Sequence, residues 1–193
     1  MESVTQRGVF DTAQVANNEN NRFTKECIYE ALWELIKHQD YNTITITRIA
    51  NKAGVSRNAI YRNFESKEDI IRKRLLECYH SFTRIINHLQ QGVSREEYVT
   101  IVCEYLCRQR EISEPLVKAN LTEFLLESFA YIKGTYNTDT ETEYYENYRI
   151  GGAIFVYLTW ISKGCQETPK QLADIVNHIC SSPAVIPDLK NIE

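Results

Sequence analysis

The chain has 193 residues, 43% of them hydrophobic, and a formal net charge of −4, which is enough length and apolar content to bury a sizeable core. No apolar run approaches the roughly 20 residues of a membrane-spanning helix and the N-terminus is not of signal-peptide type, so we expect a cytoplasmic protein without membrane contact. Seven glycines and four prolines leave few turn-forming residues for a many-stranded fold, which favours long helices.

Charge is distributed unevenly along the chain. Residues 1–90 hold 13 Lys and Arg against 11 Asp and Glu, whereas residues 91–193 hold 9 against 15. Nucleic-acid binding depends on local potential more than on the total charge. The two halves are therefore expected to meet different partners.

The first residues predict an arm followed by a helix. Residues 1–21 end in NNENN and lack apolar periodicity, so we expect a flexible arm. Apolar residues at three- and four-residue steps predict a helix over 24–38. Thr45 is expected to cap a short second helix, and Gly54 to form the turn after it, because glycine adopts a positive φ without a Cβ clash.

A third short helix and a long fourth one follow in the sequence. Ser56 is expected to cap the third helix, which turns Ile60 and Phe64 inward. Ser66 with an aspartate three residues later resembles a capping box that opens a fourth helix, which keeps its register until Gly92. The remaining sequence repeats this pattern without strand-like alternation, so the predicted fold is all-α, with later helices near 95–110, 115–134, 141–165 and 168–181.

Residues 45–64 carry four basic side chains and no acidic one. Ala50, Gly54 and Ile60 have the spacing of a helix-turn-helix, which needs a small residue at the crossing, a turn glycine and an apolar anchor. The third helix must then turn outward a donor-rich set without carboxylates, namely Arg57, Asn58, Tyr61, Arg62 and Asn63. Arginine can pair with guanine and asparagine with adenine, so double-stranded DNA is the expected partner; the alternative is a solvated corner with functionless charge.

Two segments resemble a known family. Residues 24–70, with the signature TITRIANKAGVSRNAIYRNFESKEDI, resemble the N-terminal domain of TetR-family transcriptional regulators. Residues 148–176, YRIGGAIFVYLTWISKGCQETPKQLADIV, resemble the last two helices of a subset related to regulators of dihydroxyacetone metabolism. The resemblance implies a DNA-binding domain over 22–70, a helical dimerisation and ligand-binding domain over 71–193, and repression as the commoner outcome.

The resemblance also implies roles for single residues. The expected phosphate contacts are Thr45, Thr47, Tyr61 and Lys67. The expected contacts to base edges or the adjoining backbone are Arg57, Asn58, Arg62 and Asn63. Arg48 stands where many relatives have an acidic residue that completes the helix cap, and it adds a candidate phosphate contact. A symmetric dimer would read a near-palindromic operator with half-sites whole helical turns apart, about 10 bp each.

The most apolar helix, expected over 141–165, is hydrophobic on nearly every side and so must be covered on several faces. We expect this helix, the helix over 168–181 and their symmetry mates to form a four-helix dimer interface. The alternative is an intramolecular core helix. The expected interface residues are Gly151, Gly152, Ala153, Phe155, Trp160, Leu172, Ile175 and Ile179.

Seven aromatic residues are numerous enough to line a cavity: Tyr105, Phe124, Phe129, Tyr131, Tyr148, Phe155 and Tyr157. The resemblance implies a small-molecule inducer in such a cavity. Aromatic residues at helical spacing are most often core residues, which leaves the simpler interpretation open.

Other functional classes find little support in the sequence. No nucleophile beside a base, phosphate-binding glycine loop or metal-ligand spacing is present, so we expect no enzyme, no cofactor and no metal site. The six cysteines are dispersed and are expected to be reduced thiols, although Cys103 and Cys107 lie one helical turn apart and leave redox sensing open. The alternative function is a coactivator or adaptor of the same fold that acts through a partner protein.

Overall fold

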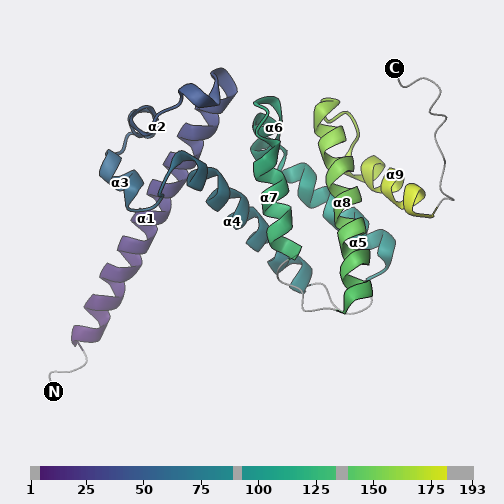
Figure 1. Cartoon of the computed structure of the whole chain (residues 1–193). Coiled ribbons are helices and arrows are strands. Elements are labelled where there is room, and N and C mark those ends of the chain that lie inside the picture. Colours follow the sequence, from purple (N-terminus) through teal and green to yellow (C-terminus); the bar gives the residue numbers. More distant parts are fainter. Residues whose placement is uncertain (1–4, 89–92, 134–138, 182–193) are drawn as a thin grey trace. The chain divides into compact units, whose positions relative to one another are not determined.

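The computed structural model describes residues 5–88, 93–133 and 139–181, and these ranges are helical without a strand (Figure 1). The all-α prediction is thereby confirmed. None of the described helices has both the length and the apolar character that crossing a bilayer requires. The helices are α1 Thr5–His38, the 3₁₀ turn η1 Tyr41–Thr43, α2 Ile46–Ala53, α3 Arg57–Tyr61, α4 Lys67–His88, α5 Arg95–Arg108, α6 Arg110–Lys118, α7 Thr122–Lys133, α8 Thr140–Ser162 and α9 Pro169–Ser181.

Contacts between residues divide the chain into two compact units. The first combines Met1–Ser81 with Ile112–Tyr136, and the second combines Phe82–Glu111 with Asn137–Glu193. This division differs from the predicted one between residues 70 and 71. The first unit extends into α4 and also includes α7, because side chains of α4 and α7 contact each other and the segment before α2.

The core of the first unit is built around α1. Helix α1 packs against α2, which in turn packs against α3, and the Tyr29 hydroxyl donates to Glu77 of α4 at 2.9 Å. The Phe64 ring meets the Tyr29 ring edge-on at 5.5 Å between centroids. The Trp33 indole N–H donates to the carbonyl of Ile112, 2.8 Å away, and so fastens α6 to α1. The fully buried side chains here include Ile28, Leu32, Ile49, Ile60, Ile70, Ile71 and Leu116.

Two helix boundaries differ from the sequence prediction. Helix α1 begins at Thr5, so its backbone continues through most of the segment expected to be a flexible arm. The side chains from Asn18 to Phe23 are exposed, and residues 1–21 lack the apolar periodicity by which the sequence would have signalled a helix. The single helix expected over 115–134 is two helices, because Asn120 adopts a left-handed conformation with φ 57° between α6 and α7.

In the second unit, α5 packs against α9. Helix α5 opens with a capping box in which Ser94 and Glu97 bond reciprocally. The Tyr157 hydroxyl of α8 donates to the Leu106 carbonyl of α5 at 3.0 Å, and its ring stacks on Trp160 at 5.9 Å. Tyr157 and Trp160 therefore belong to the core of the second unit.

Candidate nucleic-acid interface

Helix α2 starts at a well-formed cap. Thr45 is extended, with φ −109° and ψ 155°, and its hydroxyl accepts the Arg48 backbone N–H at 3.2 Å. The inner face of the helix is fixed by Ile49 and Ala50, which are buried. Thr45, Thr47 and Arg48 are all exposed as a result, at the end of the helix where free backbone N–H groups favour anions.

The turn between α2 and α3 depends on Gly54. Its φ of 68° and ψ of 26° lie in the left-handed region, which glycine adopts without steric penalty. The Gly54 N–H bonds back to the carbonyls of Ala50 and Asn51, and the Val55 N–H bonds to Ala50 at 3.0 Å. This closes α2 and sets the direction in which α3 leaves, as the sequence predicts.

Helix α3 has only five residues and is fixed at both ends. The Ser56 hydroxyl accepts the Ala59 N–H at 3.1 Å, and Ile60 and Phe64 anchor the helix in the core, with 0% and 1% of their surfaces exposed. The outer face is free: Arg57, Asn58 and Arg62 are exposed. Tyr61 is also exposed, at 51%.

Two of the predicted contact residues are engaged within the fold. The Asn63 side chain is half-buried, and its amide donates to the Ala59 carbonyl at 2.9 Å. The Lys67 ammonium donates to the carbonyls of Tyr41 and Ile44 at 2.8 and 3.2 Å. The sequence prediction did not include Tyr41, and the bond to its backbone carbonyl leaves no signal in the residue type.

The exposed face of α2 and α3 is electropositive. Arg48, Lys52, Arg57 and Arg62 are exposed, and within the described residues none of them forms an ion pair. No acidic residue occurs between Tyr41 and Phe64 in the sequence, and Glu34 of α1 interacts electrostatically with Lys52, one of the four. The arrangement offers guanidinium, amide and hydroxyl donors on a rigid, capped helix pair, which suits recognition of a polyanion with base edges.

The aromatic residues predicted to line one ligand cavity do not share one environment. In the first unit, Phe124 is buried against Tyr41 at 6.4 Å between centroids, and Phe129 is half-buried. In the second, Tyr105 and Tyr157 belong to the core, while Tyr148 and Phe155 are 83% and 69% exposed. The side chain of Tyr131 lies outside the described residues. Exposed aromatic rings cannot line an internal cavity of the single chain.

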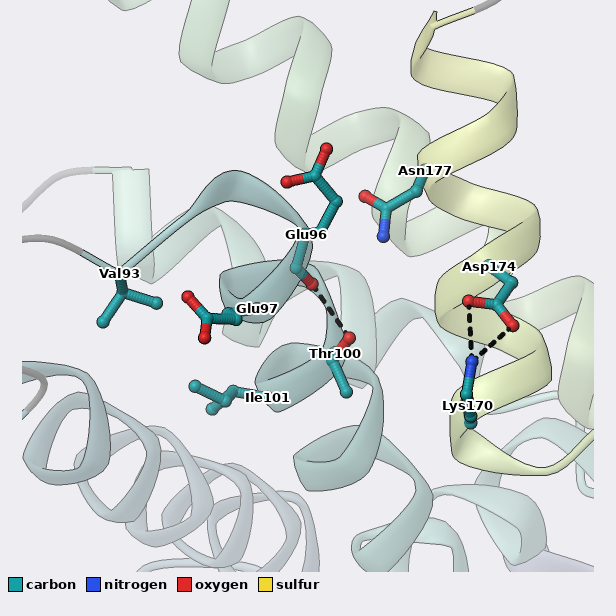
Figure 2. A pocket seen from close by; sticks show the side chains of 8 residues that line it. All are labelled: Val93, Glu96, Glu97, Thr100, Ile101, Lys170, Asp174 and Asn177. Carbon is teal, nitrogen blue, oxygen red and sulfur yellow. Dashed lines mark hydrogen bonds and ion pairs between the residues drawn. The ribbon is translucent and has the colours of Figure 1, made fainter.

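A groove between α5 and α9 has a volume of about 600 Å³, and charged and polar side chains line it together with the apolar Val93 and Ile101 (Figure 2). Lys170 is paired with Asp174 at 3.0 Å and the Thr100 hydroxyl donates to the Glu96 carbonyl at 2.8 Å. None of the seven aromatic residues predicted for the ligand cavity lines this groove. Within the described residues, no group of three His, Cys, Asp or Glu is placed to hold a metal ion.

The residues predicted for the dimer interface separate into two groups. Gly152, Ala153, Phe155, Ile175 and Ile179 are exposed on α8 and α9, and Gly151 is half-buried. By contrast, Trp160 and Leu172 are 5% and 4% exposed within the single chain. The Trp160 indole donates to the Glu167 carbonyl at 3.0 Å. These two residues are core residues of the second unit, since their surfaces are already covered without a partner.

Comparisons with known proteins agree with this architecture. Residues 28–73 match the model of bacterial regulatory proteins of the tetR family, and residues 102–182 match a transcriptional regulator C-terminal region. Curated proteins give no match.

Solved structures share the fold. A TetR transcriptional regulator from Streptococcus agalactiae is 19% identical with a TM-score of 0.60, covering 86% of this chain and 98% of its own. The fatty acid degradation regulator FadR from Bacillus halodurans is 21% identical, with a TM-score of 0.54 and coverage of 80% and 93%. The dihydroxyacetone kinase operon activator DhaS is 15% identical, with a TM-score of 0.51 and coverage of 81% and 92%. The two family matches and the shared fold show that the chain belongs to the TetR family of transcriptional regulators.

Proposed function

We propose that this regulator binds a near-palindromic operator as a homodimer in the cytoplasm and represses transcription there. The observation that carries the proposal is the outer face of α3, where Arg57, Asn58, Tyr61 and Arg62 are exposed beside a capped α2 and no carboxylate lies between residues 41 and 64. Carboxylates on such a face would repel phosphates, whereas this set presents only donors and a phenol ring.

The two helices have different tasks in this proposal. Thr45, Thr47 and Arg48, at the N-terminal end of α2, contact phosphates and set the register on the duplex. Arg57, Asn58 and Arg62 reach base edges or the adjoining backbone, and Tyr61 adds a phosphate contact. Asn63 contributes less, because its amide is already bonded to Ala59.

The dimer is proposed from the exposed face of α8 and α9. Tyr145, Tyr148, Gly152 and Phe155 follow one another at three- and four-residue steps on α8 and are exposed, which is the spacing of a helix–helix seam. A Cβ built at Gly151 or Gly152 would meet no atom of the described residues within 4 Å, so packing among those residues does not require these glycines. Glycine in a helix costs about 1 kcal/mol relative to alanine. Close approach of a second copy would explain why glycine nevertheless occupies these two positions.

Release by a small-molecule inducer would use a site other than one cavity lined by the predicted aromatic residues, because these residues do not share one environment. An inducer would act by binding one of two dimer geometries more tightly. Thermal unfolding across a panel of metabolites tests it, and a melting temperature that no compound raises counts against an inducer.

Selection from a random duplex pool, followed by fluorescence anisotropy on the enriched sequence, tests the operator proposal. We expect a near-palindrome whose affinity falls steeply with salt, because several phosphate contacts release counterions. Arg57→Ala/Arg62→Ala should reduce affinity at least about thirtyfold, since each good base contact contributes about 1–3 kcal/mol. Arg108→Ala/Lys170→Ala removes the same charge from the second unit and should have little effect.

Two results contradict the proposal. One is a pool from which no sequence is enriched; the other is equal affinity of the Arg57→Ala/Arg62→Ala variant and the wild type. If chromatin pull-down with sequencing then recovers the same sites for both proteins, the chain reaches DNA through another protein, as the adaptor alternative requires.

A further inference from the structure

Lys67, the first residue of α4, makes an unusual set of contacts for a surface lysine. Its ammonium lies 2.8 Å from the Tyr41 carbonyl, 3.2 Å from the Ile44 carbonyl and 4.1 Å from the centre of the Tyr41 ring. An ammonium has three N–H donors, and two of them are used here. A phosphate could be met only by the third donor or by breaking these bonds.

The two carbonyls belong to the segment that leads into α2. Tyr41 begins the η1 turn and its carbonyl also accepts the Ile44 N–H at 3.1 Å. Ile44 is 2% exposed and directly precedes Thr45, the cap of α2. Lys67 therefore ties the start of α4 to the last residues before the DNA-facing end of α2.

Tyr41, whose carbonyl accepts one of the Lys67 bonds, also contacts residues of α4 and α7. The Tyr41 hydroxyl donates to Glu68 at 3.0 Å, and its ring packs edge-on against Phe124 of α7. Burial, with the charge of Glu68, raises the pKa of Tyr41 above its ordinary value, so the hydroxyl keeps the proton it donates. Because these contacts hold Tyr41 in place, the bonds from Lys67 can position the backbone that follows it.

We propose that Lys67 is a positioning residue for the DNA-binding surface, which holds residues 41–44 through their carbonyls so that Thr45 starts α2 in a fixed place, and that it does not act as a phosphate ligand. The inference rests on the proposed function for its effect on DNA. The carbonyl anchor itself is a property of the free protein and can be measured without DNA.

The first test is amide hydrogen exchange in the free protein. The Arg48 and Ile49 amides bond to the side chain and carbonyl of Thr45 at 3.2 and 3.0 Å, so they report whether the start of α2 is held. Lys67→Gln should speed their exchange about tenfold or more, as local opening becomes easier. Amides of α5 and α9 serve as an internal control and should not change.

The second test is the salt dependence of binding to the selected operator. A positioning role predicts that Lys67→Gln lowers affinity about tenfold while the slope of log affinity against log salt stays that of the wild type. Loss of a phosphate contact would instead reduce the slope by about 0.9. Lys52→Gln is the comparison variant, because Lys52 is an exposed charge on the same helix pair and its loss should lower the salt slope.

The outcomes separate the two proposals. Unchanged exchange of the Arg48 and Ile49 amides, or a reduced salt slope, overturns the positioning role and leaves DNA binding in place. Failure of the wild type to bind any duplex overturns the proposed function, while the exchange measurement still decides on the anchor. If Lys67→Gln does not fold, Lys67→Met keeps the aliphatic stem beside Tyr41 and carries the same measurements.

Discussion

At the residue scale, the helix cap at Ser56 influences the directions of all the side chains on α3. Its hydroxyl accepts the Ala59 N–H at the start of a five-residue helix, where few other hydrogen bonds hold the backbone. Because the side chains proposed to read DNA lie on this one turn and a half, their directions depend on the cap.

Ser56→Ala should therefore destabilise the first unit by about 1 kcal/mol and also weaken operator binding. Ser56→Asp keeps a capping oxygen but adds negative charge, so it should retain stability and still lose affinity. Urea unfolding with anisotropy on both variants checks this. Equal affinity of wild type and Ser56→Ala would show that DNA itself orders the helix.

Buried thiols give a prediction about pH. Burial raises the pKa of Cys103 from 9.0 to about 11, and it also raises the pKa of Cys107. A thiol whose pKa is higher in the folded chain than in the unfolded chain contributes its full stabilisation below pH 9. That contribution is lost as the pH rises from 9 to 11. These thiols are mostly protonated at neutral pH, which disfavours fast reaction with oxidants.

The stability difference between wild type and Cys103→Ser should therefore shift against the wild type by about 2 kcal/mol between pH 8 and pH 10.5. Urea unfolding of both proteins at the two pH values measures it, and groups common to both cancel. A pH-independent difference would mean that Cys103 titrates in the folded chain as it does when unfolded.

At the scale of elements, a hydrogen bond and an ion pair help to join the α6–α7 segment to the rest of the first unit, beside the packing of the Tyr41 and Phe124 rings, and the two differ in strength. The indole of Trp33 bonds to the Ile112 carbonyl in a part-buried setting. Arg72 pairs with Glu127 at 2.8 Å, but the two side chains are 52% and 51% exposed, where solvent weakens an ion pair.

Trp33→Phe should thus cost about 1 kcal/mol for the lost hydrogen bond, with a further loss from the smaller ring. Arg72→Gln should cost less than about 0.5 kcal/mol. Urea unfolding followed by circular dichroism ranks the two variants. The reverse order would mean that the ion pair, and not the indole, fastens this segment.

The sequence was most informative where a local signal coincided with an element's end. Thr45, Gly54 and Ser56 act as caps and turn as predicted, because each works through its own backbone neighbourhood. It failed at Asn120, whose left-handed conformation splits one expected helix in two. Asparagine tolerates that conformation, but only packing of buried Leu116 and Leu121 decides that the chain turns there.

At the scale of the whole molecule, the glycine pair of α8 distinguishes a monomer from a dimer. Among the described residues nothing lies within 4 Å of a Cβ at Gly152, so in a monomer Gly152→Ala should stabilise the helix by about 1 kcal/mol. In the proposed dimer the added methyl group should instead obstruct a neighbouring helix and weaken association.

Sedimentation and unfolding of Gly152→Ala measure the two effects together. We expect a higher dimer dissociation constant, and Phe155→Glu should give monomers. Trp160→Ala is the contrasting variant, because it should unfold the second unit through a cavity. A Gly152→Ala protein that is more stable and equally dimeric would place the interface elsewhere.

Sequence reasoning could identify α8 as a helix that needs cover but could not say which residues face inward. Apolar residues surround it on nearly every side, so the pattern alone does not separate Trp160, which the chain buries, from Phe155, which it leaves exposed. Only tertiary packing makes that distinction. For the same reason the aromatic residues of the expected ligand cavity could not be assigned to a core or a surface.

The shortness of α3 has a consequence for how such a regulator can be retargeted. Of its five residues, only Ala59 and Ile60 are buried, so Arg57, Asn58 and Tyr61 can be randomised without disturbing the hydrophobic core. A library at these three positions should yield mostly folded proteins that differ in the DNA sequence they prefer. The DNA-contacting residues of this helix can thus be exchanged while the rest of the fold stays unchanged.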